Sequence, residues 1–149
     1  DIEREMIELI GSVESMAENF RLLKSIPGIS FVNAVNLIIF TDNFKGFSDA
    51  RKFASYCGIA PFEYSSGTSI NKGTHVSKMA NKMLKADLSM AARATVWCDT
   101  ELKTYYERKR AEGKSFGCVL NAVKFKLICR AFAVIKRGTP YVNTKKFAV

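Results

Sequence analysis

Residues 77–97, SKMANKMLKADLSMAARATVW, carry the clearest helical period in the chain. Side chains of one kind recur there every three or four residues, which is the spacing that places them on one face of an α-helix. The stretch therefore predicts a helix over about 77–97 with three distinct faces. The cationic face comprises Lys78, Lys82, Lys85, Ser89 and Arg93. The face suited to close packing comprises Ala80, Leu84, Leu88, Ala91 and Thr95, and a third stripe comprises Met79, Met83, Met90 and Trp97.

Outward from this stretch, apolar residues keep a helical period through most of the chain. They predict helices over about 2–24, 31–40, 100–112 and 115–137, and a short helix that Ser48 or Asp49 caps and Gly58 stops. Pro27 and Gly28 break the first helix, and Gly113 and Gly138 suit the positions just after a helix end. We therefore expect an all-α fold, a compact helical bundle with a long polar loop between two of its helices.

The domain organisation follows from length and from these breaks. The 149 residues, 48% of them hydrophobic, are enough for one core and too few for two ordinary domains. Acidic residues on the polar side of the first helix suggest the end of a coiled-coil linker over 1–22. We expect one domain over 23–142, divided into parts 23–60, 61–76 and 77–138, and a tail over 143–149.

The last helix, over 115–137, is apolar on two faces, as is typical of a buried helix. We expect it to be the central helix of the bundle, with a subunit interface as the alternative. Arg130 lies near one apolar stripe and needs a partner there. Cys118 and Cys129 are expected to be buried thiols. Since none of the four cysteines forms a CxxC pair, a zinc site is not expected.

The charge is strongly basic and unevenly placed. The formal net charge is +9, residues 1–18 hold six acids and one base, and residues 113–149 hold eight bases and no acid. A basic body of this kind indicates a polyanionic partner, for which nucleic acid is the first choice, although a basic soluble protein is the plain alternative. No apolar run approaches a membrane span and no signal segment is present, so we expect a cytoplasmic protein.

Residues 60–76 lack an apolar period and contain the run Tyr64-Ser65-Ser66-Gly67-Thr68-Ser69. They predict a long loop or a short β excursion. One interpretation of these hydroxyls is a plain surface turn. The other is a functional loop that supplies a serine nucleophile or binds phosphate. A serine nucleophile needs a base or a metal to activate it. His75 could take part, although an ordinary loop residue is the simpler interpretation, and the acidic residues form no convincing metal-binding cluster.

The turn within residues 23–34 resembles the hairpin of helix-hairpin-helix DNA-binding modules. In those modules a Gly-apolar-Gly turn offers backbone N–H groups to a DNA phosphate. Here Gly28 and Ile29 are followed by Ser30 in place of the second glycine. A simple tight turn between two helices is the alternative.

Motifs along most of the chain, from about Leu23 to Tyr141, together resemble the C-terminal domain of the IS110/IS116/IS902 insertion-sequence transposases, a family that includes the Piv-like DNA invertases. The motifs are Ser25-Ile26-Pro27-Gly28-Ile29, Phe47 to Phe53 leading into Tyr56-Cys57-Gly58-Ile59-Ala60-Pro61, Ser66-Gly67, Val76-Ser77-Lys78 with Asn81, Leu84-Lys85, Tyr105-Tyr106-Glu107, Gly113-Lys114-Ser115 and Gly138-Thr139-Pro140-Tyr141. The chain departs from the family at Ser30 and Ala80, where glycine is usual. It also departs at Lys85, where arginine is usual and lysine keeps the charge without the bidentate fork.

The resemblance implies a mechanism and a set of partners. The serine directly before the glycine, Ser66, would be the nucleophile that forms a covalent intermediate with DNA. Mg²⁺ would be held by an N-terminal RuvC-like domain, which this chain lacks, so we expect no cutting or joining by the chain alone. The implied partners are transposon-end and target DNA, a structured guide RNA from the element and further copies of the protein. The residues expected to contact nucleic acid are Gly28, Ser30, Gly67, Lys72, Lys78, Lys82, Lys85 and Arg93.

Three hypotheses follow from the sequence. The chain is a DNA-binding part of a transposase or site-specific recombinase that supplies a serine nucleophile to a composite active site. Alternatively, it is a non-catalytic nucleic-acid-binding module built from the turn and the cationic helix. The third hypothesis is a helical assembly module in which the loop serine is incidental.

Overall fold

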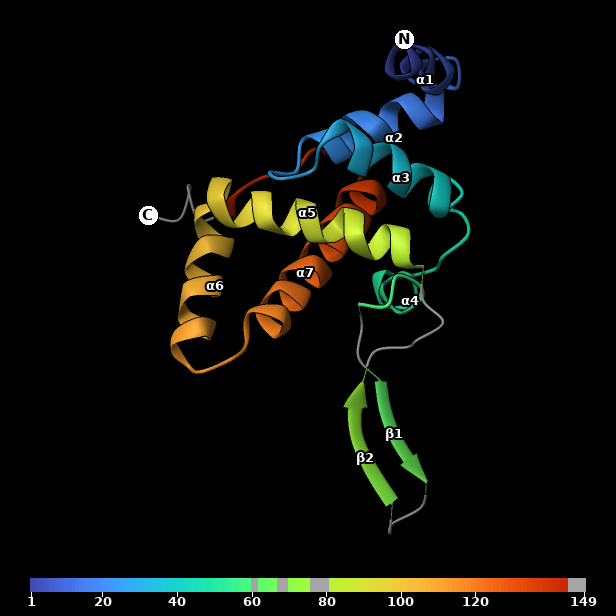
Figure 1. Cartoon of the computed structure of the whole chain (residues 1–149). Helices are drawn as coiled ribbons and strands as arrows, with labels where there is room; N and C mark the ends of the chain where they lie inside the picture. The colour runs from blue at the N-terminus through green and yellow to red at the C-terminus, as the bar shows by residue number, and fades with distance from the viewer. Residues whose placement is uncertain (60–61, 67–69, 76–80, 145–149) are drawn as a thin grey trace.

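The computed structural model describes residues 1–59, 62–66, 70–75 and 81–144. Its elements are α1 (Ile2–Gly11), α2 (Glu14–Lys24), α3 (Phe31–Phe40), α4 (Ala50–Tyr56), β1 (Phe62–Ser66), β2 (Ile70–His75), α5 (Lys82–Cys98), α6 (Thr100–Ala111) and α7 (Phe116–Arg137). Figure 1 shows the helices gathered around α7, with the two strands projecting beyond α4. The predicted all-α bundle is confirmed, with one β-hairpin inserted into it.

The core is built around α7, as predicted. This helix packs on α2, α4, α5 and α6, and its two apolar faces supply the buried residues Val119, Leu120, Val123, Leu127, Ile128, Ala131 and Val134. Gly138 ends the helix with φ of +69°, a left-handed conformation that glycine adopts without steric cost. Within the described ranges, no helix combines the length and the apolar character that crossing a bilayer requires.

The prediction of a buried Cys118 is wrong, because this thiol is exposed. Cys118 belongs to the first turn of α7, and Val119 is the first buried residue of that helix. Phe116 is exposed too, so the buried stripe of α7 begins only at Val119. Cys129 is only half-buried.

The single helix predicted over 2–24 is two helices. It breaks at Ser12 and Val13, where the Ser12 hydroxyl donates to the Leu9 carbonyl at 2.7 Å and Val13 adopts extended backbone. Gly11 and Ser12 favour this break, because glycine has low helix propensity and serine competes for backbone hydrogen bonds. Ile10 is the buried residue of α1, which packs on α2. The coiled-coil assignment of this region stays a prediction.

The turn after α2 is fixed by its contact with α5. Gly28 has φ of +90°, and a Cβ at this position would lie 1.8 Å from the Thr95 hydroxyl oxygen. That hydroxyl donates to the Ala91 carbonyl at 2.7 Å and lies 3.3 Å from the Pro27 carbonyl. The backbone of the turn therefore rests directly on the buried face of α5, which only a glycine permits.

Arg130 has the partners that the sequence analysis required. Its guanidinium lies 2.9 Å from an oxygen of buried Asp99 and 3.5 Å from one of Glu101. The ring of Tyr141 covers the guanidinium at 4.7 Å, and the Tyr141 N–H donates to the Ser25 hydroxyl at 2.8 Å. The segment after α7 is thereby attached to α6 and to the end of α2.

Candidate nucleic-acid interface and nucleophile

Of the two forms predicted for residues 60–76, the structure has the β excursion. β1 and β2 pair antiparallel, with Phe62 opposite His75, Ser65 opposite Asn71 and Ser66 opposite Ile70. The register shifts between Glu63 and Ser65, where β2 has one residue more than β1. Lys72 belongs to this irregular part of β2, and such bulges bend a strand locally. Gly67 lies outside the described residues.

The register separates Ser66 from His75. Ser66 pairs with Ile70 at one end of the ladder, and His75 pairs with Phe62 at the other. Five residue steps of about 3.4 Å each put roughly 17 Å between the two ends of β2. Because a general base must lie within hydrogen-bond reach of the proton it takes, His75 of the same hairpin does not serve Ser66 in this conformation.

The hairpin stands apart from the helical body. Among the described residues, β1 and β2 contact each other and none of the helices, and Figure 1 shows them extending away from α4 and the start of α5. Ser66 is thus at the outer end of a projection, away from the side chains of the body. Groups that complete a reactive site around it would have to come from another part of the protein or from its partner.

The basic face of α5 is present over the part that the structure describes. Lys82, Lys85 and Arg93 are all exposed, while the packing face is buried at Leu84, Leu88, Ala91 and Thr95. The Arg93 guanidinium lies 5.7 Å from the centre of the Phe116 ring on α7, a cation–π distance that holds it in place. Lys78 lies outside the described residues.

The helix begins five residues later than predicted, at Lys82 instead of residue 77. Asn81 caps it, and its side-chain oxygen accepts hydrogen bonds from the N–H groups of Met83 and Leu84, each at 3.1 Å. The Asn81 N–H also donates to the Tyr56 carbonyl at 2.9 Å. The N–H groups of Met83 and Leu84 are therefore not free for a phosphate at this helix start, because the cap already uses them.

The third stripe of α5 is exposed instead of packed. Met83, Met90 and Trp97 are 56%, 72% and 81% exposed. The helical spacing correctly placed them on a common side of the helix, but spacing alone does not show which side the rest of the chain covers.

Gly28 and Ser30 both have roles inside the fold. Gly28 allows the close approach to Thr95. Ser30 caps α3, and its N–H donates to the Asn33 side chain at 2.8 Å. The backbone donor that a helix-hairpin-helix turn would offer to phosphate at this position is therefore already used. Their assignment to DNA binding stays a prediction.

Lys124 of α7 is a residue that the sequence analysis missed. It is only 6% exposed, and burial, together with the like charges of Lys85 and Arg93, lowers its pKa below the ordinary lysine value. A signal was available in the sequence, because the residues four before, three after and four after it, Leu120, Leu127 and Ile128, are all apolar. A lysine with such neighbours lies on the packed side of its helix.

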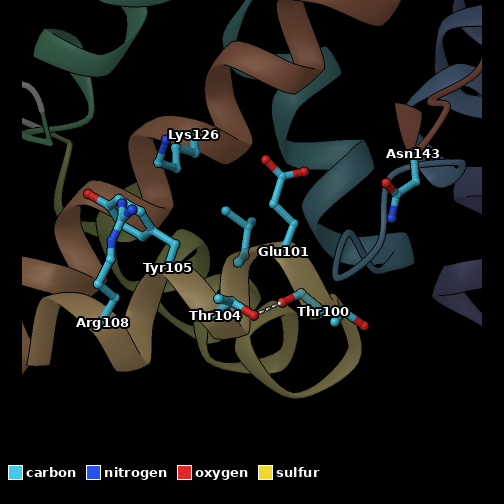
Figure 2. Close-up of a pocket in the computed structure, with 8 residues that line it drawn as sticks. Thr100, Glu101, Thr104, Tyr105, Arg108, Lys126 and Asn143 are labelled. Carbon is cyan, nitrogen blue, oxygen red and sulfur yellow. Dashed lines mark hydrogen bonds between the residues drawn. The ribbon is translucent and has the colours of Figure 1, made fainter. Parts of the chain in front are cut away.

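A pocket of about 510 Å³ lies on another part of the surface, lined by α6, Lys126 of α7 and Asn143. In Figure 2 the Tyr105 ring lies beside Arg108 and Lys126, whose charged groups are 5.7 and 4.6 Å from the ring centre. The Thr104 hydroxyl donates to the Thr100 carbonyl at 2.9 Å. Both cations lie over the Tyr105 ring, and no residue singled out from the sequence as a site residue lines the pocket.

Metal and thiol chemistry find no support in the described part of the chain. It contains no group of three His, Cys, Asp or Glu side chains able to hold a metal ion. The Mg²⁺ implied by the family resemblance therefore does not fit these residues. Burial raises the pKa of Cys57 to about 12, which leaves this thiol protonated and inert at neutral pH.

The class of this chain follows from its sequence relatives, which make it a domain of an insertion-sequence transposase family. The chain belongs to the Transposase IS116/IS110/IS902 family, whose sequence model matches residues 20–107. It is 36% identical over 120 residues to an insertion element IS110 protein of Streptomyces coelicolor, covering 80% of this chain and 29% of that protein. It is 26% identical to the pilin gene-inverting protein of Moraxella bovis, covering 94% of this chain and 44% of that protein. The chain therefore spans less than half the length of these relatives.

Proposed function

We propose that this chain is the DNA-handling domain of a transposase and that it supplies Ser66 as the nucleophile of a composite active site. The observation that carries the proposal is the position of Ser66 at the outer end of a hairpin that contacts none of the described helices. A nucleophile presented on a projection can enter a site completed by another domain or subunit. The family membership and the name of the gene-inverting relative support DNA rearrangement as the reaction class.

The reaction is a transesterification. The Ser66 Oγ forms a bond to a DNA phosphorus atom while one P–O bond of that phosphodiester breaks. The serine proton passes to a base, and the leaving oxygen gains a proton to become a strand-end hydroxyl. Attack by another strand-end hydroxyl then releases Ser66, so no net oxidation or reduction occurs. His75 is not this base, because it pairs at the opposite end of the hairpin from Ser66.

DNA binding rests on the exposed cations of α5. Lys82, Lys85 and Arg93 form a ridge on the helix that follows the hairpin, and such cations bind the DNA backbone without reading its sequence. We expect the ridge and Ser66 to contact different phosphates, because Ser66 lies at the end of the hairpin opposite to His75, the end of β2 that leads toward α5.

Ser66→Ala in the protein that contains this chain tests the nucleophile, with Ser65→Ala as the matched control. We expect Ser66→Ala to abolish both recombination and the covalent protein–DNA adduct trapped by detergent, while duplex binding is unchanged. Ser65→Ala should retain both. A covalent adduct that persists in Ser66→Ala would contradict the assignment of Ser66 as the nucleophile and would favour a non-catalytic binding module.

Neutralising the ridge tests the binding surface. The triple variant Lys82→Gln, Lys85→Gln, Arg93→Gln should weaken duplex binding uniformly across sequences and reduce the slope of log affinity against log salt by about three. The control triple is Arg51→Gln, Lys103→Gln, Lys136→Gln, which removes three exposed cations from other helices. Fluorescence anisotropy over a salt series measures both. Equal losses in the two triples would show that only net charge matters.

A further inference from the structure

Lys124 has an unusual environment for a lysine. Its burial is 94%, and it is the only base among the buried polar residues of the described part of the chain. The other ionisable residue in that group, Asp99, has Arg130 as a partner at 2.9 Å. No hydrogen bond or ion pair within the described ranges involves Lys124. Most of the Lys124 side chain is therefore covered, while its ammonium keeps some access to the surface and has no anion beside it.

The charges nearest to Lys124 have the same sign. Lys85 and Arg93, two helical turns apart on α5, are the charged groups that act on its ammonium, and both disfavour its protonated form. Helices α5 and α7 pack against each other, and Arg93 is held over Phe116 of α7. Three cations from two packed helices thus face the α5–α7 seam, and no carboxylate of the described residues is among the charges that act on Lys124.

We propose that Lys124, Lys85 and Arg93 form a binding site for one phosphate group of a nucleic-acid backbone. A phosphate on the seam would pair with the two exposed cations and with Lys124 beneath them. Charge-assisted hydrogen bonds are stronger where less water competes, and the largely covered Lys124 side chain supplies such a donor. The site is continuous with the α5 ridge, because Lys85 and Arg93 belong to both. The inference rests on the proposed function for the identity of the partner.

The alternative is a structural lysine whose alkyl stem fills space in the core and whose ammonium is solvated and binds no ligand. The two explanations differ for Lys124→Met, which keeps a long apolar stem and removes the charge. If Lys124 is a binding residue, its covered charge has no anion in the free protein and lowers the free energy of unfolding. Its replacement should then raise the melting temperature of the free chain and weaken phosphate binding. A structural lysine would leave phosphate affinity unchanged.

The test compares the wild-type chain, Lys124→Met and the control Lys126→Met, an exposed lysine two residues away that lies over Tyr105. We expect Lys124→Met to lower affinity for a short DNA duplex roughly tenfold and Lys126→Met to lower it far less. Lys124→Arg, which keeps the charge, should recover part of the affinity. If Lys124→Met fails to fold, Lys124→Gln takes its place in the same assay.

Thermal melting with inorganic phosphate separates this inference from the proposed function. A wild-type chain that binds no duplex contradicts DNA handling, whatever Lys124 does. If phosphate then stabilises the wild-type chain but not Lys124→Met, the site takes free phosphate and its assignment to a nucleic-acid backbone is wrong. Equal duplex affinity in the wild type and Lys124→Met, or equal losses in Lys124→Met and Lys126→Met, overturns the site itself.

Discussion

At the scale of single residues, the fold depends on a few close contacts that tolerate no extra atoms. Gly28 is the clearest, because its backbone approaches Thr95 of α5 more closely than any side chain would allow. The motif around Pro27 and Gly28 therefore has a packing explanation that is independent of DNA. This contact orients the α2–α3 turn on the helix that carries the basic ridge.

Gly28→Ala should destabilise the chain by about 2–4 kcal/mol, because it adds left-handed backbone strain to a steric clash with Thr95. Gly113→Ala is the matched control, since Gly113 also has φ of +90° but no atom within 4 Å of the added Cβ. It should cost only the strain, about 1–2 kcal/mol. Urea unfolding followed by circular dichroism measures both, and equal losses would show that the contact with Thr95 is unimportant.

At the scale of elements, the helices form the core and the hairpin lies outside it. Side chains from six helices, α2 to α7, make up the main buried cluster together with residues of the connecting turns, while β1 and β2 contact none of the helices in the described ranges. Regions with few contacts to a core add little to its stability and are free to serve binding or catalysis. The hairpin fits this description, and α5 connects it to the core.

Replacing residues 62–75 with a Gly-Ser linker should therefore change the free energy of unfolding by no more than about 1 kcal/mol. The variant should melt cooperatively near the wild-type temperature and keep the ridge-dependent duplex binding. It should form no covalent adduct with DNA in the longer protein. Loss of cooperative melting would mean that the hairpin is part of the folding unit.

At the scale of the whole molecule, Arg130 connects parts that are distant in the sequence. It joins α7 to Asp99 at the start of α6, and its contact with Tyr141 helps fix the segment that reaches back to Ser25. The side chains of Arg130 and Asp99 are 14% and 2% exposed. An ion pair this deeply buried cannot lose one partner without leaving an uncompensated charge.

Arg130→Met should destabilise the chain by about 3–5 kcal/mol, because Asp99 is then buried without its partner. Arg108→Met removes an arginine from an exposed pair with Glu112 at 3.9 Å and should cost less than about 1 kcal/mol. Thermal unfolding monitored by calorimetry compares the two. A small loss in Arg130→Met would show that Asp99 finds another partner or takes up a proton.

The sequence by itself determined the helices whose signals are local. The spacing of apolar residues and the boundary residues Asp49 and Gly138 place α3, α4, α6 and α7 within a residue or two of where they lie. Residues 20–107 also carry the family membership. The position of Arg130 beside an apolar stripe of its helix was enough to predict that it has a partner. Each of these signals acts over one or two helical turns, which is the range that a sequence pattern describes directly.

Only the tertiary structure decided which faces are covered and which polar residues meet. Burial depends on what packs from elsewhere in the chain, so periodicity could not show that Met90 and Trp97 are exposed. Nor could spacing show that Lys124 is buried beside two cations of α5, because those residues are more than 30 positions away. Strand register, which is a long-range property, placed Ser66 and His75 at opposite ends of the hairpin.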